Sequence, residues 1–490
     1  MKRAVALLAL AAPLAGCGLF GDSYQRPALD MPLSFRGENA PANQQSFGDL
    51  GWWEVYRDPG LQELIKTALE QNYDVKIAAA RVEEFRAQAG IARIGQLPQI
   101  TAGADAEHSR ISAIGRTPLP ATTPAIGNDF SGEIDLSYEV DLWGRVSNLT
   151  RAARADLLAT EFARDAVRTG LIADVATTYF NLLALDQQLA VTEQTVASRQ
   201  KFLDLTKAQF ERGVVSGLDV SRAEANLAAA QANIPDFRRQ ITQAEDQLQV
   251  LLGRNPAAVQ RTTPVDALPA ATPPVVPAGL PAALLERRPD VREAEYDLIA
   301  ADARLKSVKA SLIPIITLTG SIGSESAELS DFLSGPAKTW SIGVDIAASI
   351  INSTVNIKQV DVFSARQQQT QFQYQKTVLQ ALQEVADALA ARKGYSDALR
   401  AQEAQVVALR SASERVLQRY AAGYSSYFEV ISADQDLYSA ELLRVLAYRD
   451  ALTAGVQLYK ALGGGWQAAA DSPSPAADAP TGSGKPAVPQ

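Results

Sequence analysis

Phe210–Val220 reads FERGVVSGLDV and Tyr420–Val430 reads YAAGYSSYFEV, and this pair of stretches decides the fold. The two lie 210 residues apart (420 − 210), and the same offset carries Leu252-Gly253 onto Leu462-Gly463. Self-similarity at a fixed offset indicates a duplicated structural unit. The chain is therefore predicted to be a tandem duplication in which helix, strand pair, very long helix, tight turn and helix follow in order.

A very long helix is expected before each turn. Residues 146–212 contain no proline and a single glycine, and at ~1.5 Å per residue they span about 100 Å as a helix. Apolar residues recur every seven positions, the spacing of a coiled-coil seam, so this helix should pack along partner helices. The seam residues are Val175, Leu182, Leu189, Val196, Leu203 and Phe210, and their second-half equivalents are Val385, Arg392, Leu399, Val406, Ser413 and Tyr420.

Two segments alternate strictly between polar and apolar residues. Residues 131–142 and 340–350 each place apolar side chains on one face, with carboxylates or other small and polar residues on the opposite face. This pattern is typical of a membrane-barrel wall, although a half-buried soluble sheet shows it too. Four strands per chain cannot close, and an open edge is not viable in hydrocarbon, so an oligomer is expected. The predicted lumen residues are Glu133, Asp135, Glu139, Asp141 and Asp345.

The amino terminus resembles a bacterial lipoprotein signal. A basic start and a short apolar run at residues 4–12 precede Leu14-Ala15-Gly16-Cys17, which matches the lipobox. An apolar run this short is not a membrane span. We expect cleavage before Cys17, the only cysteine, and acylation of that residue, with an ordinary signal peptide as the alternative. Gly18, in place of the aspartate that marks inner-membrane retention, favours the outer membrane of a Gram-negative bacterium.

Composition argues against several classes of function. Removing residues 1–16 takes away Lys2 and Arg3, so the net charge goes from −9 to −11 (−9 − 2), and no nucleic-acid binding by phosphate neutralisation is expected. One cysteine and one histidine leave little basis for Cys–His or Ser–His catalysis or for a histidine-rich metal site. We therefore expect no enzyme activity, no metal, and no cofactor beyond a covalent lipid on Cys17.

Proline, glycine and composition shifts set the expected segment boundaries. The segments are a signal peptide (1–16), an acylated extended segment (17–58), a first repeat (59–253, strands about 98–142, helical hairpin about 146–253), a Pro-rich equatorial linker (254–281), a second repeat (282–465, strands about 314–351, helical hairpin about 355–463) and a disordered tail (466–490). Pro235 is expected to kink the first returning helix.

Several motifs together resemble one known family. They are the lipobox, the duplicated unit with its two G-x(5)-[DE]-V turns, Leu280–Pro289 (LPAALLERRP) followed by Asp290-Val291, and Asp141–Arg145 (DLWGR). Over about residues 15 to 465 the chain resembles the TolC-like outer-membrane efflux factors, and within them the acylated OprM/NodT-type lipoprotein branch. It departs from the family at Asn352-Ser353-Thr354, where a glycine pair is common.

The resemblance implies a mainly α fold with a membrane β-barrel portion. Three copies would form a twelve-stranded β-barrel in the outer membrane, joined to a twelve-helix periplasmic α-barrel with an equatorial domain. The implied partners are two further copies of the chain, a periplasmic adaptor, an inner-membrane transporter of the resistance-nodulation-division type and outer-membrane lipid. The periplasmic tip of such a duct is closed at rest.

The turns at the tip carry the candidate functional residues. Asp219 and Glu429 would form rings of carboxylates that can hold a pore shut through pairs with basic or tyrosine side chains. The alternative is that both residues cap the positive ends of the returning helices. The candidate partners are Arg212, Arg419 and Tyr420, and the positions implied for adaptor docking are Gly213, Gly217, Gly423 and Ser425.

Three functions compete. The leading hypothesis is the outer-membrane channel of a tripartite efflux pump for drugs or other small amphiphiles. The second is an exit duct for protein secretion driven by an ABC-type pump, which the lipobox disfavours. The third is a non-conducting lipoprotein that spans the periplasm.

Overall fold

The computed structural model describes residues 24–36, 46–112, 124–261, 279–348 and 353–466. Cys17 and the tail after residue 466 lie outside the described residues. The chain divides into two compact units, each built from three segments. Unit 1 comprises Met1–Met31, Asp74–Asp165 and Pro289–Ala381, and unit 2 comprises Pro32–Tyr73, Ala166–Arg288 and Leu382–Gln490.

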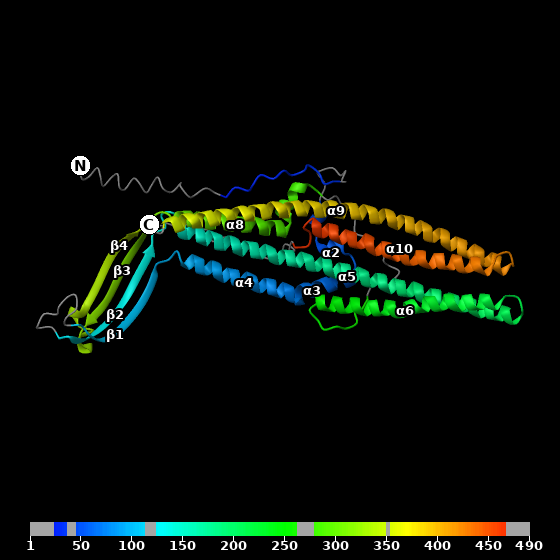
Figure 1. The fold of residues 1–490 in the computed structure, drawn as a ribbon, viewed down its shortest axis with the longest axis horizontal. Coiled ribbons are helices and arrows are strands. Elements are labelled where there is room, and N and C mark those ends of the chain that lie inside the picture. Colours follow the sequence, from blue (N-terminus) through cyan, green and yellow to red (C-terminus); the bar gives the residue numbers. More distant parts are fainter. Residues whose placement is uncertain (1–23, 37–45, 113–123, 262–278, 349–352, 467–490) are drawn as a thin grey trace, which may run out of the picture. The chain divides into compact units, whose positions relative to one another are not determined.

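The two halves of the chain repeat one order of elements, as the duplication predicted (Figure 1). The first half has α2 (Trp52–Val55), α3 (Pro59–Gln71), α4 (Tyr73–Ile94), β1 (Gln99–Arg110), β2 (Ile126–Glu139), α5 (Arg145–Glu211) and α6 (Gly217–Leu251). The second half has α7 (Leu284–Arg287), α8 (Pro289–Ala310), β3 (Ile315–Ser326), β4 (Lys338–Ala347), α9 (Ser353–Ala421) and α10 (Tyr427–Ala461). Short 3₁₀ helices are η3 (Phe47–Asp49), η5 (Pro281–Ala283), η6 (Leu329–Asp331) and η7 (Gly335–Ala337). Pro235 lies inside α6, which continues on both sides of it.

Four glycines end the long helices in matching ways. Gly213 follows α5 with φ +75°, and Gly423 follows α9 with φ +79°. Their N–H groups donate to carbonyls three residues earlier, at 2.8 and 3.0 Å. Gly253 and Gly463, with φ +70° and +77°, end α6 and α10 in the same way. Because L-residues other than glycine rarely adopt this left-handed conformation, these positions stop the helices where they do.

The strands, which belong to unit 1, form one antiparallel sheet in the order β1-β2-β3-β4 (Figure 1). The register pairs Asp135 with Thr101 on one side and with Ser321 on the other. Residues directly opposite each other point to the same face of a sheet. The polar face carries Thr101, Glu133, Asp135, Ser321 and Asp345, whereas the apolar face carries Ile100, Ile134, Leu136, Ile322, Trp340, Ile342 and Ile346.

The apolar face of the sheet is open to its surroundings in the single chain. Trp340 and Ile342 are 75% and 83% exposed. The predicted two-faced sheet is therefore present, but β2 ends at Glu139. The alternation in the sequence placed Asp141 on this strand, and that placement is wrong.

Of the twelve predicted seam residues, which lie in unit 2, five are buried, six are half-buried and Phe210 is exposed. Val175, Leu182, Val385 and Val406 are all at most 2% exposed, which fits helices that pack along one another. The charged seam residue Arg392 places its guanidinium 5.9 Å from the centre of the Phe47 ring. Burial lowers the pKa of Arg392.

Among the described residues, no helix is both long and apolar enough to cross a membrane.

Candidate functional site

The turns between α5 and α6 and between α9 and α10 lie beside one packed cluster in unit 2. Its buried members are Leu203, Ala223, Leu227 and Tyr427, and Val196, Phe202, Val220, Tyr420 and Ile431 pack against them; we call this set the tip cluster. The rings of Phe202 and Tyr427 stack with centroids 5.3 Å apart and planes 8° from parallel. All four long helices contribute, so the cluster fastens one helical hairpin to the other.

Asp219 and Glu429 both cap the returning helices. The Asp219 carboxylate accepts the Ser216 N–H at 3.1 Å and the Ser216 hydroxyl at 2.8 Å. Glu429 accepts the Ser426 N–H at 3.4 Å, and its own N–H donates to the Ser426 hydroxyl at 3.3 Å, which completes a capping box. The Ser425 hydroxyl, which donates to Glu429 at 2.8 Å, lowers the pKa of that carboxyl, with the Ser426 N–H as the next contributor.

The predicted partners of these acids have other contacts. Arg419 donates to the backbone carbonyl of Tyr424 at 3.1 Å, across its own turn. The Tyr420 hydroxyl donates to the side-chain oxygen of Gln209 at 3.0 Å and so joins the two hairpins. Burial, and then the charge of Asp219, raise the pKa of Tyr420. The structure thus brings Tyr420 close to Asp219 without a direct hydrogen bond between them, and Arg212 is exposed.

Both turns also expose apolar side chains that the sequence interpretation passed over. Val214 and Leu218 on the first turn, and Tyr424 and Phe428 on the second, are between 59% and 78% exposed. The predicted docking glycines Gly213, Gly217 and Gly423 are exposed as well, and Ser425 is half-buried. Exposed apolar groups gathered in one place are typical of surfaces that bind another protein.

The predicted lumen acids divide into two groups. Glu133 and Asp345 are exposed on the polar face of the sheet, and Asp135 is half-buried there. Glu139 accepts from the Nε and Nη2 atoms of Arg145, at 2.8 and 2.5 Å. Asp141 accepts the first free N–H groups of α5, those of residues 146 and 147, at 3.0 and 2.7 Å. Asp141 is therefore positioned as a helix cap.

A buried polar network next to the tip cluster was missed from the sequence. Arg199, only 6% exposed, donates to the Asp434 carboxylate at 2.7 Å and to the Asn226 carbonyl at 2.8 Å. Its guanidinium also lies 5.2 Å from the centre of the Tyr438 ring. One signal was available: Arg199 is three residues after a seam position, Val196, and therefore on the packed side of its helix.

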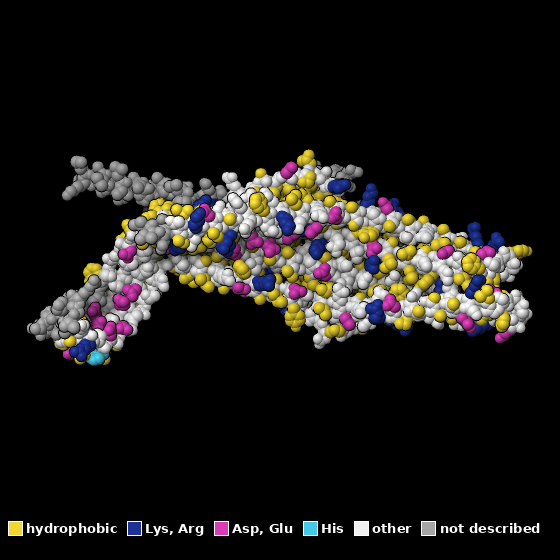
Figure 2. Space-filling model, in the orientation of Figure 1, with side chains coloured by type: hydrophobic (Ala, Val, Ile, Leu, Met, Phe, Trp, Pro, Cys, Tyr) yellow, Lys and Arg dark blue, Asp and Glu magenta, His cyan; other side chains and the backbone are white. Residues whose placement is uncertain are grey.

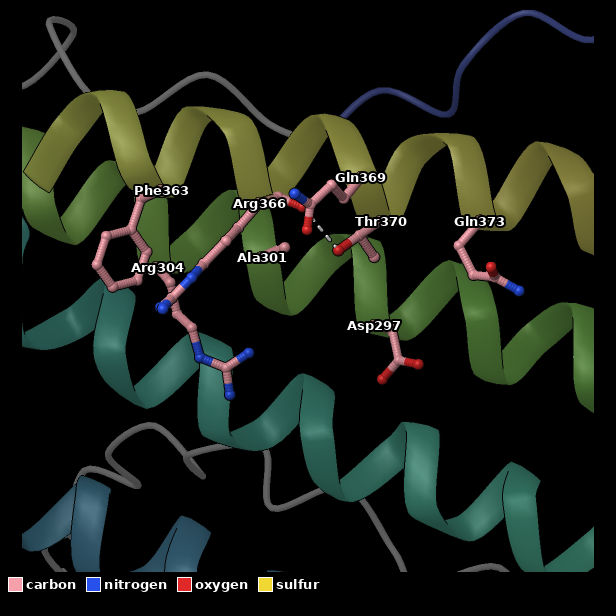
Figure 3. A pocket seen from close by; sticks show the side chains of 8 residues that line it. All are labelled: Asp297, Ala301, Arg304, Phe363, Arg366, Gln369, Thr370 and Gln373. Carbon is pink, nitrogen blue, oxygen red and sulfur yellow. Dashed lines mark hydrogen bonds between the residues drawn. The ribbon is translucent and has the colours of Figure 1, made fainter.

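A concave region lies in unit 1 between α8 and α9 (Figure 3). Its volume is about 620 Å³, and it is lined by Asp297, Ala301, Arg304, Phe363, Arg366, Gln369, Thr370 and Gln373. Arg304 already pairs with Asp156, and the Arg366 guanidinium lies 5.2 Å from the Phe363 ring centre. Most of its lining residues are polar or charged, and Ala301 and Phe363 are the apolar ones.

His108, the single histidine, is exposed on β1 near the end of the sheet (cyan in Figure 2). Its ring nitrogen Nδ1 lies 2.5 Å from the Asn128 side-chain oxygen on the paired strand. Within the described part of the chain, no group of three or more His, Cys, Asp and Glu side chains could hold a metal ion.

Comparison with known proteins gives one consistent family. The model of the family described as "Outer membrane efflux protein" matches residues 64–254 and 280–464. The toluene efflux pump outer membrane protein TtgC of Pseudomonas putida is 33% identical over 473 residues, covering 95% of this chain and 96% of the relative. The solvent efflux pump outer membrane protein SrpC of Pseudomonas putida is 35% identical over 460 residues, with 92% and 96% covered.

A solved structure agrees in fold. The open state of the Neisseria gonorrhoeae MtrE outer membrane channel superposes with a TM-score of 0.81 at 29% identity. The match covers 91% of this chain and 98% of that channel. The mainly α fold with a strand portion, predicted from the sequence, is therefore confirmed by both the elements and the structural neighbour.

Proposed function

Because this chain belongs to the outer membrane efflux protein family, we propose that it is the exit duct of a tripartite pump that expels small amphiphiles. Its relatives are outer-membrane components of efflux pumps, and the family consists of transport proteins. In the proposed assembly, an inner-membrane transporter of the resistance-nodulation-division type passes substrate through a periplasmic adaptor into the duct. The names of the two relatives support aromatic and solvent-like substrates.

The observation that carries the proposal is the two-faced sheet. Its apolar face exposes large side chains such as Trp340 and Ile342, which suits lipid, while its polar face suits a water-filled lumen. In the sheet as described, β1 and β4 each pair with one strand only. Since an open edge in hydrocarbon leaves backbone groups unsatisfied, we propose that three copies close a twelve-stranded barrel. Glu133, Asp135 and Asp345 would then line its lumen.

Lipidation at Cys17 completes the proposed attachment to the outer membrane. The lipobox at Leu14-Ala15-Gly16-Cys17 supports this proposal. The adaptor would dock on the two turns, where Val214, Leu218, Tyr424 and Phe428 expose apolar surface. We propose that Asp219 and Glu429 combine two roles: they cap the returning helices and contribute charge to the closed tip.

Single-channel recording in planar bilayers tests both roles. Asp219→Ala with Glu429→Ala removes the caps and the charge, whereas Asp219→Asn with Glu429→Gln keeps an acceptor oxygen for the caps and removes the charge. If charge closes the tip, both double variants raise the conductance. An effect of the alanine pair alone would assign these residues to capping only, and no conductance from any variant would favour the non-conducting lipoprotein.

Crosslinking in living cells separates efflux from secretion. Tyr424 is 78% exposed, so a photo-reactive residue that replaces it is accessible to a bound partner. This replacement leaves the hydrogen bond between Ser425 and Glu429 in place. Capture of an adaptor for a resistance-nodulation-division transporter is expected. Capture of an adaptor for an ABC exporter would move the assignment to secretion.

A further inference from the structure

A small cavity lies between the two helical hairpins, next to the tip cluster. Its volume is about 130 Å³, and side chains from α5, α6, α9 and α10 line it. The lining includes Phe202, Tyr427 and Leu417 on the apolar side and Arg199, Asn226 and Asp434 on the polar side. All of these residues belong to unit 2.

The cavity has an identifiable origin in the sequence. Ser413 lines it from α9 and occupies a position of the seven-residue seam. The equivalent seam residue of the first half is Leu203 (413 − 210), which is 4% exposed within the tip cluster. Serine is smaller than leucine, so the second half lacks the side chain that would fill this space. Well-packed protein interiors leave few voids larger than a water molecule.

The polar side of the cavity holds an unsatisfied donor. The Nε and Nη1 atoms of Arg199 donate to Asp434 and to the Asn226 carbonyl, respectively. Its Nη2 atom is buried and has no hydrogen-bond partner among the described residues. A buried donor without a partner is unfavourable by about 1–3 kcal/mol, so an acceptor that enters the cavity is stabilised there.

The cavity's chemistry selects an uncharged ligand with one acceptor. Arg199 and Asp434 already neutralise each other, and a charged ligand would bring an uncompensated charge into the site. An apolar cavity of about 150 Å³ in another protein holds one benzene molecule, so about 130 Å³ suits a single small ring. A single water, whose share of liquid volume is about 30 Å³, would occupy only part of this space and would leave the apolar Phe202 and Leu417 side chains without a contact.

We propose that this cavity binds a monocyclic, uncharged amphiphile of the phenol class, with the ring beside Phe202 and Tyr427 and the oxygen accepting from Arg199. A ligand in this position contacts both hairpins. Because it binds only while the hairpins are packed together, it stabilises that arrangement by mass action. The inference does not rest on the proposed function, since binding here requires neither conduction nor a pump.

Photo-labelling of the full-length protein in lipid nanodiscs tests the site. The probe is 4-azidophenol, and the labelled peptides are identified by mass spectrometry. We expect saturable labelling of peptides that contain Phe202, Leu417 or Tyr427, and at least a tenfold reduction by excess phenol. Labelling of these peptides that is absent, or that phenol does not reduce, would overturn the proposal and leave water as the occupant.

A seam variant provides the matched control. Ser413→Leu installs the residue found at the equivalent first-half position and should reduce labelling at least tenfold. Ser411→Leu adds the same side chain at an exposed position of α9 outside the cavity and should leave labelling unchanged. Phenol should also raise the thermal unfolding midpoint of the unaltered protein and of Ser411→Leu, but not that of Ser413→Leu. Equal labelling of both variants would contradict the assigned site even if each one folds.

Discussion

Replacing Gly253 by alanine should loosen the end of α6 far more than replacing Gly213 loosens the end of α5. The two glycines have nearly the same φ, +70° and +75°, so the backbone strain of adding a Cβ is shared. That strain is about 1–2 kcal/mol for an L-residue in the left-handed region. A Cβ at Gly213 meets no other atom within 4 Å, whereas a Cβ at Gly253 lies 2.4 Å from the Gln71 carbonyl oxygen.

The close approach adds a second penalty at Gly253. Overpacking of this kind typically destabilises by about 1–3 kcal/mol, because the neighbouring backbone has to move. Moving it also disturbs two hydrogen bonds that hold α3 to the end of α6: Asn72 to the Leu251 carbonyl at 3.0 Å and Arg254 to Gln71 at 3.1 Å. The expected total is about 2–5 kcal/mol at Gly253, against about 1–2 kcal/mol at Gly213.

Hydrogen–deuterium exchange read by mass spectrometry measures this difference locally. When closing is faster than exchange, the rate rises tenfold for each 1.4 kcal/mol of lost local stability. Peptides at the end of α6 should therefore exchange roughly 30-fold or more faster in Gly253→Ala, and peptides at the end of α5 roughly 5- to 30-fold faster in Gly213→Ala. Equal acceleration in the two variants would refute the reasoning, since it would mean that the contact with Gln71 contributes nothing.

Three further predictions concern other parts of the chain. Burial raises the pKa of Glu293 to about 7, and the charges of Asp297 and Asp290 add to this shift. In the unfolded chain the same carboxyl has a pKa near 4.5, so on raising the pH it loses its proton there first. The stability of the folded protein should therefore fall as the pH rises from about 4.5 to about 7. Glu293→Gln should flatten that change in the thermal midpoint, and an unaltered slope would contradict the assignment. Glu295→Ala should make the segment around Arg26 exchange about tenfold faster, because it removes a two-point ion pair at 2.6 and 2.8 Å. Cys17→Ala should abolish the incorporation of labelled fatty acid into the protein. Continued labelling of this variant would contradict lipidation at Cys17.

The sequence was most informative where one residue type alone satisfies the geometry. Glycine is needed at left-handed helix ends, so the pairs Gly213 with Gly423 and Gly253 with Gly463 revealed the duplication and the ends of the long helices. Strand alternation likewise predicted the two faces of the sheet. The alternation pattern failed at Asp141, because a carboxylate between a strand and a helix fits both the strand alternation and a helix cap. Only the positions of the α5 N–H groups, which donate to Asp141, decide for the helix cap.

The polar network at Arg199 and the neighbouring cavity could not be predicted from the sequence. Both depend on contacts between the α5–α6 hairpin and the α9–α10 hairpin, which are distant from each other in the sequence. The seam showed that Ser413 breaks an apolar series, but not whether its neighbours close the gap. A charged residue near a seam similarly predicts that a partner exists without identifying Asp434.

The ion pair between Arg26 and Glu295 sets a geometric limit on the membrane anchor. Glu295 is 6% exposed at its side chain, and Arg26 holds the incoming chain against α8 at that point. Nine residue steps (26 − 17) separate Arg26 from Cys17, and a fully extended chain covers at most about 3.3–3.6 Å per step, so the tether reaches about 30 Å. If Cys17 carries the lipid, the inner leaflet of the outer membrane lies within that radius of α8. For a lipidated Cys17, this short tether would set an upper limit on the distance between Arg26 and the membrane surface.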